Sequence, residues 1–135
     1  MEKRSFEGVE IGDELPETKP DVSMDKVRAF CRAAGNTFGR FTDHEVARKE
    51  GLPSAIVPGI MSQALLAAIV HRWAPGSRIE KIDTVFRAPI PVDSQPLCRA
   101  VVTDLDAEND TVEVDLTIVN EAGETRVLGT ARVRL

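Results

Sequence analysis

Apolar and polar positions follow a helical period in the first third of the chain. In the segment 23–35, apolar residues recur every three or four positions, at Val27, Phe30, Cys31 and Ala34, as on one face of an amphipathic helix. Ser23 is a typical N-cap and Gly35 a typical C-terminal glycine. A second short helix is expected over residues 43–51, with a loop over 36–42 between the two. The residues before Ser23 predict an irregular arm with one short strand near residues 18–22.

The segment 59–73 predicts a longer helix that is apolar on almost every side. Its large apolar residues are Ile60, Met61, Leu65, Leu66, Ile69 and Val70. Only its last turn, at His71 and Arg72, is plainly polar. Pro58 is tolerated at the start because the first N–H groups of a helix lack helical partners, and the sequence Ala-Pro-Gly at 74–76 ends it. A helix with so small a polar face must be enclosed by other structure.

The residues after 76 predict strands. Four segments carry the pattern: 79–86, 97–105, 112–118 and 126–135. In the last of them, Val127, Ala131 and Val133 share one face, and Arg132 and Arg134 share the other. The sequence PIPVDSQP at 89–96 predicts a rigid connection, whereas short turns join the later strands, which favours antiparallel pairing.

One simple arrangement buries both an apolar helix and the apolar face of the antiparallel sheet that follows it. The sheet curls around the helix and buries it, which is the hot-dog arrangement of an α+β fold. We therefore predict a curved antiparallel sheet wrapped around a central helix at about residues 59–73. A chain of 135 residues is long enough for one domain with a core, so a single domain over residues 1–135 is expected.

Composition narrows the classes of function. The net charge of −5 is modest and spread along the chain, which argues against nucleic acid because phosphate binding needs a basic stripe. The polar, acidic start predicts no signal peptide. The longest apolar run, at 64–70, is far shorter than the ~20 residues of a membrane span. A cytoplasmic protein with no nucleic-acid or membrane partner is therefore expected.

The two cysteines, Cys31 and Cys98, lie far apart in different kinds of segment. Two reduced and buried thiols are the expected arrangement for a cytoplasmic protein. The two cysteines and two histidines stand at scattered spacings and do not supply the ligand set of a zinc site. No metal and no cofactor are predicted.

The segment 35–68 resembles the MaoC-like, or (R)-specific enoyl-CoA hydratase, branch of the hot-dog superfamily. The similar stretches are Ala-Gly at 34–35, TDHEVARKEGLP at 42–53 and PGIM at 58–61, and RIEKIDTVFRAPIPVDSQPL at 78–97 resembles the family's strand and Pro-containing connection. The resemblance covers nearly the whole chain in order and spacing. It implies a hot-dog fold and a ligand that is an acyl-CoA or acyl-carrier thioester.

The chain departs from this family at the catalytic positions. The family's catalytic Asp falls on Asn36, its catalytic His on Phe41, and the His before the helix glycine on Pro58. In active members the Asp and His hold a water and pass its proton during addition to a 2-enoyl thioester. Neither an amide nor a benzyl group can exchange a proton in this way, so about 10²–10⁴-fold of rate would be lost. The acyl-carrier-protein dehydratases of the superfamily have a Glu in the helix, where this chain has Ser62 and Gln63.

One catalytic feature of the family, a backbone N–H that polarises the substrate carbonyl, is compatible with this sequence. The resemblance implies that a backbone N–H at Gly59 polarises the thioester carbonyl, because helix N-terminal amides favour developing negative charge. Gly59 has an equally good structural explanation, since a glycine lets the helix pack tightly against a strand. Pro58 and Arg40 are further candidates for substrate binding, although Arg40 also fits a solvated loop residue.

Asp43 and His44 are candidate substitutes for the missing pair, because they follow Phe41 closely. The structural alternative is that Asp43 caps the short helix and that His44 points to water in its first turn.

Three functions are compatible with this pattern. The first is a degenerate MaoC-like subunit that binds an acyl thioester or supports an active partner, in a homodimer or in a heteromer with another hot-dog chain. The second is an active hydratase or dehydratase that uses Asp43, His44 or a partner's groups. The third is a non-enzymatic module that binds a hydrophobic small molecule beside the central helix. Edge pairing of the sheet favours an oligomer in every case.

Overall fold

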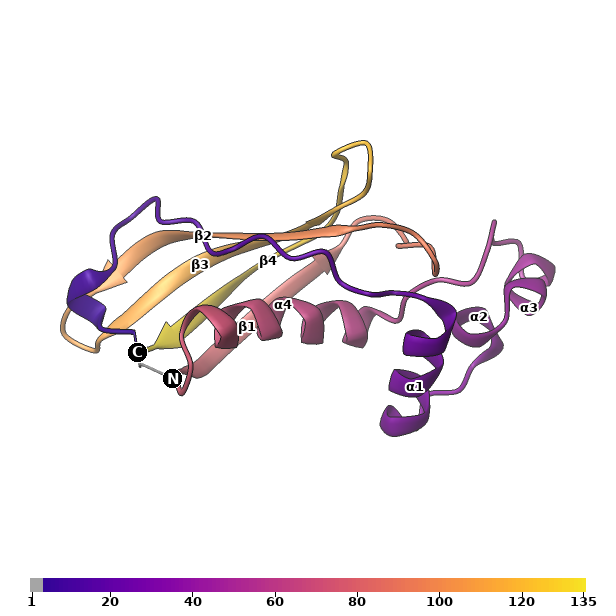
Figure 1. Cartoon of the computed structure of the whole chain (residues 1–135), viewed down its shortest axis with the longest axis horizontal. Helices are drawn as coiled ribbons and strands as arrows, with labels where there is room; N and C mark the ends of the chain where they lie inside the picture. Colours follow the sequence, from indigo (N-terminus) through magenta and orange to yellow (C-terminus); the bar gives the residue numbers. More distant parts are fainter. Residues whose placement is uncertain (1–3) are drawn as a thin grey trace.

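A four-stranded antiparallel sheet curves around one long helix in the computed structural model, which describes residues 4–135 (Figure 1). The elements in chain order are η1 (Phe6–Gly8), α1 (Met24–Ala34), α2 (Gly39–Thr42), α3 (His44–Lys49), α4 (Gly59–Trp73), β1 (Arg78–Phe86), β2 (Leu97–Asp106), β3 (Thr111–Val119) and β4 (Thr125–Arg134). The strand order is β1-β4-β3-β2, with every neighbouring pair antiparallel. The predicted hot-dog arrangement is therefore confirmed.

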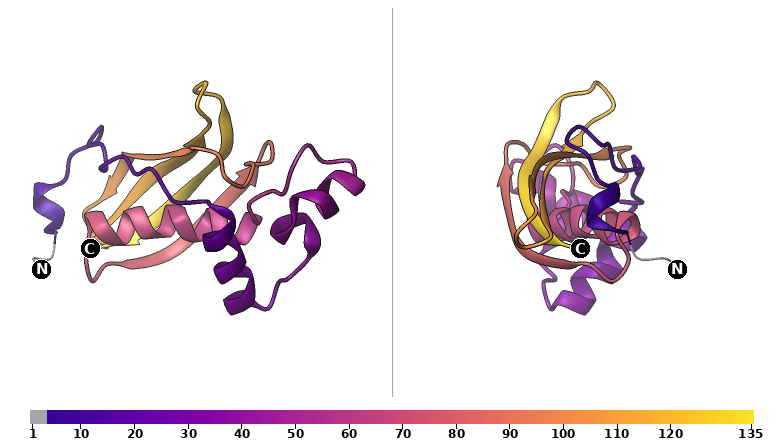
Figure 2. Two further views of the ribbon diagram at one scale, coloured as in Figure 1. Left: turned by 45° about the vertical axis from the view of Figure 1, so that its right-hand side comes forward. Right: turned by 90° about the vertical axis from the view of Figure 1, so that its left-hand side faces the viewer.

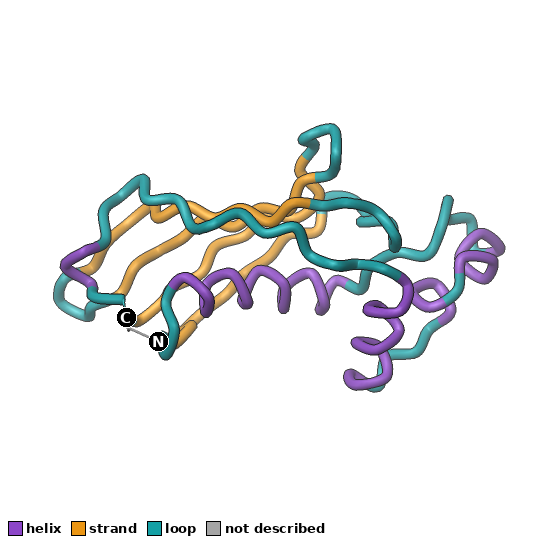
Figure 3. Tube along the Cα trace, viewed as in Figure 1, coloured by secondary structure: helices purple, strands orange, loops and turns teal. Residues whose placement is uncertain are grey.

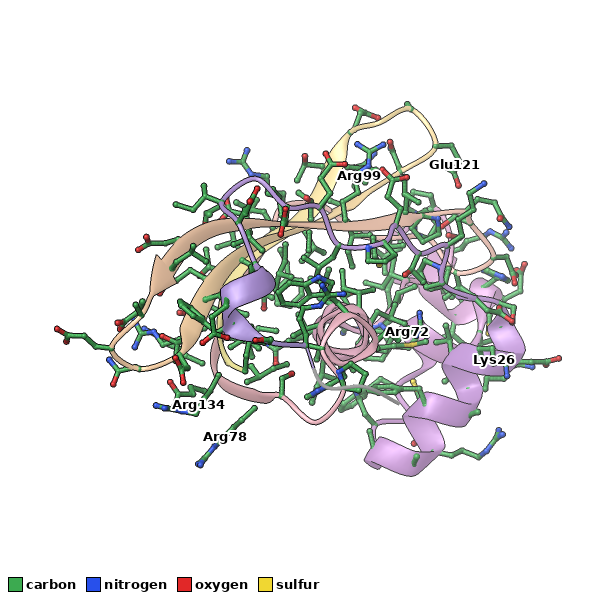
Figure 4. All side chains as sticks on the ribbon, turned by 60° about the vertical axis from the view of Figure 1, so that its left-hand side comes forward. Lys26, Arg72, Arg78, Arg99, Glu121 and Arg134 are labelled. Atoms are coloured by element: carbon green, nitrogen blue, oxygen red, sulfur yellow. The ribbon has the colours of Figure 1, made fainter. Side chains whose placement is uncertain are left out.

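The core lies between α4 and the concave face of the sheet. From the helix, Leu66, Ile69, Val70 and Trp73 are buried. From the sheet, alternate residues of the strands meet them, among them Val114, Leu116, Ile118, Val127 and Val133. Figure 4, in which α4 is seen end-on, shows side chains filling the space between helix and sheet. The nearly all-round apolar character of α4 is thus explained by its enclosure.

Three shorter helices lie beyond the N-terminal end of α4 (Figure 2). In α1 the side chain of Ser23 accepts a hydrogen bond from the N–H of Lys26 at 3.4 Å, and Gly35 has a φ of 70°. Both caps were predicted, and the predicted apolar stripe is confirmed by the burial of Val27 and Cys31. The positive φ of Gly35 is a left-handed conformation that glycine adopts without strain.

Two predictions for the first third of the chain were wrong. The expected loop over 36–42 contains α2, a single turn closed by the N–H of Asp43 and the carbonyl of Gly39 at 2.9 Å. One turn is too short to produce a detectable apolar period. In the described chain, residues 18–22 form no strand, only an isolated bridge between Thr18 and Cys98. Pro20 has no N–H with which to extend this pairing.

Within residues 4–135, no helix combines the length and the apolar character that a membrane crossing requires.

Replacement of Leu66 tests whether enclosure of α4 stabilises the fold. Leu66 is fully buried, so we expect Leu66→Ala to lower the free energy of unfolding by about 2–5 kcal/mol through lost burial and a residual cavity. Urea unfolding followed by far-ultraviolet circular dichroism measures this change. Ile11→Ala is the matched control, because Ile11 is 63% exposed, and it should alter stability by no more than ~0.5 kcal/mol. Equal effects of the two changes would contradict the assigned core.

The two cysteines should be unreactive in the folded protein. Both thiols are free and buried, and burial raises the pKa of Cys98 to about 12 and that of Cys31 above its usual value. A raised pKa keeps the thiol protonated at pH 8, and the thiolate is the reactive form. We expect Ellman's reagent to label neither cysteine at pH 8 and both after addition of guanidinium chloride. Rapid labelling without denaturant would show that the thiols are accessible.

Candidate functional site

A cavity of about 280 Å³ opens at the N-terminal end of α4. The start of the helix, the end of β1, the connection after β1 and the segment before the helix all contribute to its wall. The lining residues are Phe41, Ile56, Val57, Gly59, Ser62, Phe86, Arg87, Ala88, Pro89, Ile90 and Val127. Most of these side chains are apolar, so the cavity suits an apolar group with few polar contacts.

The first turn of α4 presents unpaired backbone donors to this cavity. Pro58 occupies the N-cap position and no side chain caps the helix. The N–H of Ser62 is the first that reaches back to Pro58, at 3.1 Å from its carbonyl oxygen. The N–H groups before it, including that of Gly59, therefore have no partner within the helix. Together with the helix dipole they favour a partial negative charge at this end.

Gly59 also makes close packing possible at this point. A Cβ added to Gly59 would lie 3.1 Å from the ring of Phe86 at the end of β1. The structural explanation of this glycine therefore has direct support. The same residue lines the cavity, so a ligand can approach its backbone as well.

Phe41 forms part of the cavity wall. Its ring is half-buried and meets Phe38 edge to face, with ring centroids 6.5 Å apart. The structure thus brings Phe41 and Gly59 to one cavity, as the resemblance implied. Where that resemblance expects an imidazole, an apolar ring faces the cavity.

Asn36 follows the C-terminus of α1 and is not among the lining residues. Its N–H donates to the carbonyl of Cys31 at 2.8 Å. Its side-chain oxygen Oδ1 is buried and has no hydrogen-bond partner among residues 4–135. Such an unsatisfied acceptor is uncommon in folded proteins, because burial without a donor costs free energy.

Asp43 has the structural role expected for a cap. Its Oδ1 accepts hydrogen bonds from the N–H groups of Glu45 at 2.8 Å and Val46 at 3.2 Å. This geometry fixes the start of α3 and leaves Asp43 outside the cavity lining.

The expectation that His44 points to water was wrong. The ring nitrogen Nδ1 accepts a hydrogen bond from the N–H of Ala55 at 3.1 Å, and Nε2 lies 3.0 Å from Oδ2 of Asp93. Because a backbone N–H can only donate, Nδ1 carries no proton and Nε2 donates to Asp93. Both nitrogens are occupied, so His44 joins α3 to two loops and has no free position for acid–base chemistry.

Asp93 is the centre of this arrangement. Its Oδ1 accepts from the N–H of Met24 at 2.9 Å, at the start of α1, and its own N–H donates to the carbonyl of Val22 at 2.9 Å. These contacts hold it at a φ of 69°, which is uncommon outside glycine. The hydrogen bonds from His44 and Met24 lower the pKa of Asp93 below its usual value.

Arg40 is paired on the surface and does not line the cavity. Its Nε lies 3.4 Å from a carboxylate oxygen of Glu50, and both side chains are about half exposed. Among the described residues, the only ionisable one in the lining is instead Arg87. The residues 86–90 were not predicted as site residues, although the Pro-containing connection that carries most of them was noted in the sequence.

Two other kinds of site have no support in the structure. A groove of about 430 Å³ lies at the opposite end of the sheet, where Arg132 and Arg134 project from β4. Its two arginines already pair with carboxylates, Arg134 with Glu80 at 2.9 Å and Arg132 with Glu113 at 3.3 Å, and Figure 4 shows Arg134 pointing away from α4. Within the described residues, no group of three or more His, Cys, Asp or Glu side chains is placed to hold a metal ion.

Solved structures show which known proteins share this architecture. The (R)-hydratase from A. caviae involved in PHA biosynthesis superimposes with a TM-score of 0.90 at 20% identity, over 95% of this chain and 98% of that one. A MaoC-like dehydratase gives 0.90 at 26% identity, over 98% of this chain and 42% of the longer protein. A chain of the ChsH1–ChsH2 complex from Mycobacterium tuberculosis gives 0.86 at 19% identity, over 93% and 98%.

Sequence comparison adds nothing to this result, since no protein-family model and no curated protein matches the chain. The structural likeness spans nearly the whole chain and has the same order of helix and strands. The chain therefore has the hot-dog fold of the (R)-hydratases and MaoC-like dehydratases.

Proposed function

We propose that this chain binds an acyl thioester, carried by coenzyme A or by an acyl carrier, in the cavity at the start of α4. In this proposal it does not hydrate or dehydrate the ligand and acts as a degenerate or supporting subunit. One observation carries the proposal: the cavity adjoins the helix N-terminus, yet among residues 4–135 no lining residue has a carboxylate or an imidazole.

The proposed thioester binding rests on the backbone N–H groups at the start of α4 and on the apolar side chains that line the cavity. A thioester carbonyl oxygen beside Gly59 would meet the free N–H groups of the first helical turn. The acyl group would lie against the apolar wall, for example against Phe41 and Val127. A volume of about 280 Å³ suits a short acyl group, because pockets for larger ligands commonly exceed ~300 Å³.

The proposed absence of hydratase activity rests on the same cavity-lining residues. Addition of water to a 2-enoyl thioester needs a base to take a proton from water and an acid to give one to carbon. Phe41 supplies neither group, and Asn36 does not line the cavity. The guanidinium of Arg87 offers hydrogen-bond donors and no acceptor, so it cannot serve as the base. A supporting role agrees with the likeness to a chain of the ChsH1–ChsH2 complex.

The two alternatives have less support. Asp43 caps α3 and His44 has both nitrogens bonded, so an active enzyme built on these residues would have to break existing hydrogen bonds. The other alternative, a module that binds apolar molecules without a thioester, would use the same cavity as the main proposal. The two differ in whether ligand binding requires the thioester and its carrier.

The first test measures binding and hydration together. We expect butyryl-CoA to raise the thermal midpoint of the protein, because a ligand that binds only the folded state stabilises it. Coenzyme A alone and butyrate alone should raise it less. Crotonyl-CoA should not be hydrated above the uncatalysed rate in a spectrophotometric assay. Equal stabilisation by butyrate would favour the module for apolar molecules, and hydration by the wild type would contradict the proposal.

The second test restores the missing pair. The double variant Asn36→Asp/Phe41→His should gain hydration of crotonyl-CoA by about 10²-fold over the wild type, the lower end of the contribution of placed acid–base groups. The matched control Asn36→Asp/Phe41→Gln introduces the carboxylate and a polar side chain at position 41 but no imidazole, and should gain nothing. A folded double variant that binds butyryl-CoA without hydrating crotonyl-CoA would show either that a carboxylate at position 36 does not reach the ligand or that the backbone at Gly59 does not polarise the carbonyl.

The third test asks whether His44 and Asp93 are structural. The pKa of Asp93 is lowered in the fold from 3.8, so its carboxylate stabilises the protein above that pH and the stabilisation is lost as the pH falls through the folded pKa. We expect the wild type to be more stable than Asp93→Asn at neutral pH, with a difference that shrinks below about pH 4. Urea unfolding across this pH range measures it. A constant difference, or loss of hydration in His44→Gln without loss of stability, would favour a chemical role.

A further inference from the structure

Two loop segments pair with each other along the wall of the cavity. Residues 55–57 lead into α4, and residues 90–92 belong to the connection between β1 and β2. Figure 3 shows these stretches among the loops and turns. They are joined by two backbone hydrogen bonds of 2.8 and 2.9 Å and by one isolated bridge, and the pairs are Val57 with Ile90, Val92 with Ala55, and Ile56 with Pro91. Because residues of both segments line the cavity, this pairing shapes its wall.

The imidazole of His44 connects the two segments at one end of this pairing. Its Nδ1 accepts a hydrogen bond from the N–H of Ala55 at 3.1 Å, and its Nε2 lies 3.0 Å from Oδ2 of Asp93. Ala55 is the first residue of one segment, and Asp93 follows the last residue of the other. Ala55 is fully buried, and a buried N–H that loses its acceptor is costly. The ring therefore holds the segment 55–57 in place.

Both contacts of His44 can exist together only while the ring carries one proton. A neutral imidazole has one donor and one acceptor nitrogen, whereas an imidazolium has two donors. A second proton would therefore direct an N–H of the ring at the N–H of Ala55, and the hydrogen bond between them would be lost. The bond to Asp93 would persist, because a carboxylate accepts strongly from a charged donor. Protonation would thus release the segment 55–57 and keep the ring on the other segment.

Solvent protons can reach this ring, because the side chain of His44 is 30% exposed. Among residues 4–135, Asp93 is the one charged group within hydrogen-bond distance of the ring. The charged groups on the surrounding elements are Asp21 before α1, Lys26 and Arg28 in α1, Asp43 at the start of α3, and Glu45 and Arg48 within it. Glu45 and Arg48 pair with each other, and Asp43 is occupied by backbone N–H groups. A proton on His44 would therefore act mainly on its two direct partners.

We propose that the contacts of His44 with Ala55 and Asp93 form a proton-sensitive latch on the cavity wall. The neutral ring holds the segment 55–57 against 90–92, and the protonated ring releases it. The released segment continues directly into Pro58 and the first turn of α4, so ligand binding there should weaken as the pH falls through about 8 to 5, where imidazoles gain a proton. This effect on the ligand rests on the proposed thioester binding, whereas the release of Ala55 does not.

Nitrogen NMR of the histidine rings tests the latch without any ligand. The chain has two histidines, His44 and His71, so the variant His71→Gln leaves one imidazole to observe. At about pH 8 we expect the tautomer with its proton on Nε2. As the ring gains its second proton, the protection of the Ala55 amide against hydrogen exchange, relative to an unfolded peptide at the same pH, should fall about tenfold, the effect of one lost hydrogen bond.

His44→Asn is the matched variant, because its side-chain oxygen can accept from Ala55 in place of Nδ1 but does not titrate. The protection of Ala55 in this variant should not change with pH, and in His44→Leu, which has no acceptor, it should be low at every pH. Circular dichroism confirms that each variant is folded. Three results in the chain that keeps His44 would overturn the latch: a proton on Nδ1 at about pH 8, a ring still neutral at about pH 5, or full protection of Ala55 beside a protonated ring.

Binding of butyryl-CoA over the same pH range tests the effect on the cavity. The Kd should rise about tenfold on acidification when His44 is present and change little in His44→Asn. Titration of the ligand itself is common to both proteins and cancels in this comparison. His71→Gln should keep the pH dependence of the wild type, since His71 lies in the last turn of α4. Equal pH dependence with and without His44 would overturn the effect on the ligand. Absence of binding at every pH would contradict the proposed function, and the protection of Ala55 would still decide on the latch.

Discussion

Burial of α4 against the concave face of the sheet is the interaction on which the rest of the structure depends. The helix has almost no polar face, and residues such as Leu66 and Ile69 are removed from water only because the strands bend around them. The same packing fixes where the helix begins. Its N-terminus is brought beside the end of β1 and the connection that follows, and the cavity is the space left between these segments.

Most of the architecture was predictable because its signals are local. The helix α4 has the predicted bounds, since Pro58 starts it and the Ala-Pro-Gly sequence after Trp73 ends it. The four strands were recognised from alternation, which burial along β3 and β4 bears out. The features that were missed depend on individual hydrogen bonds, which leave no trace in the spacing of apolar residues along the sequence. The single turn of α2 and the isolated bridge of Thr18 are of this kind.

The candidate site was predicted only in part. Phe41 and Gly59 were singled out from the resemblance, and the structure places both at one cavity. The far wall comes from Phe86 and the connection after it, which reach the helix through strand register rather than through nearby sequence. The role of His44 was missed because its partner Asp93 is 49 residues away. The pattern of a short segment cannot reveal a hydrogen bond over that separation.

Residues 12–18 lie along the outer side of β2 and occupy that edge of the sheet through backbone hydrogen bonds of 2.8–3.1 Å. A sheet with two open edges can add strands on both sides, and repeated addition leads to a fibre. With one edge occupied, strands can be added only on the side of β1. A few main-chain hydrogen bonds near the start of the chain thus remove one of the two directions in which a fibre could grow.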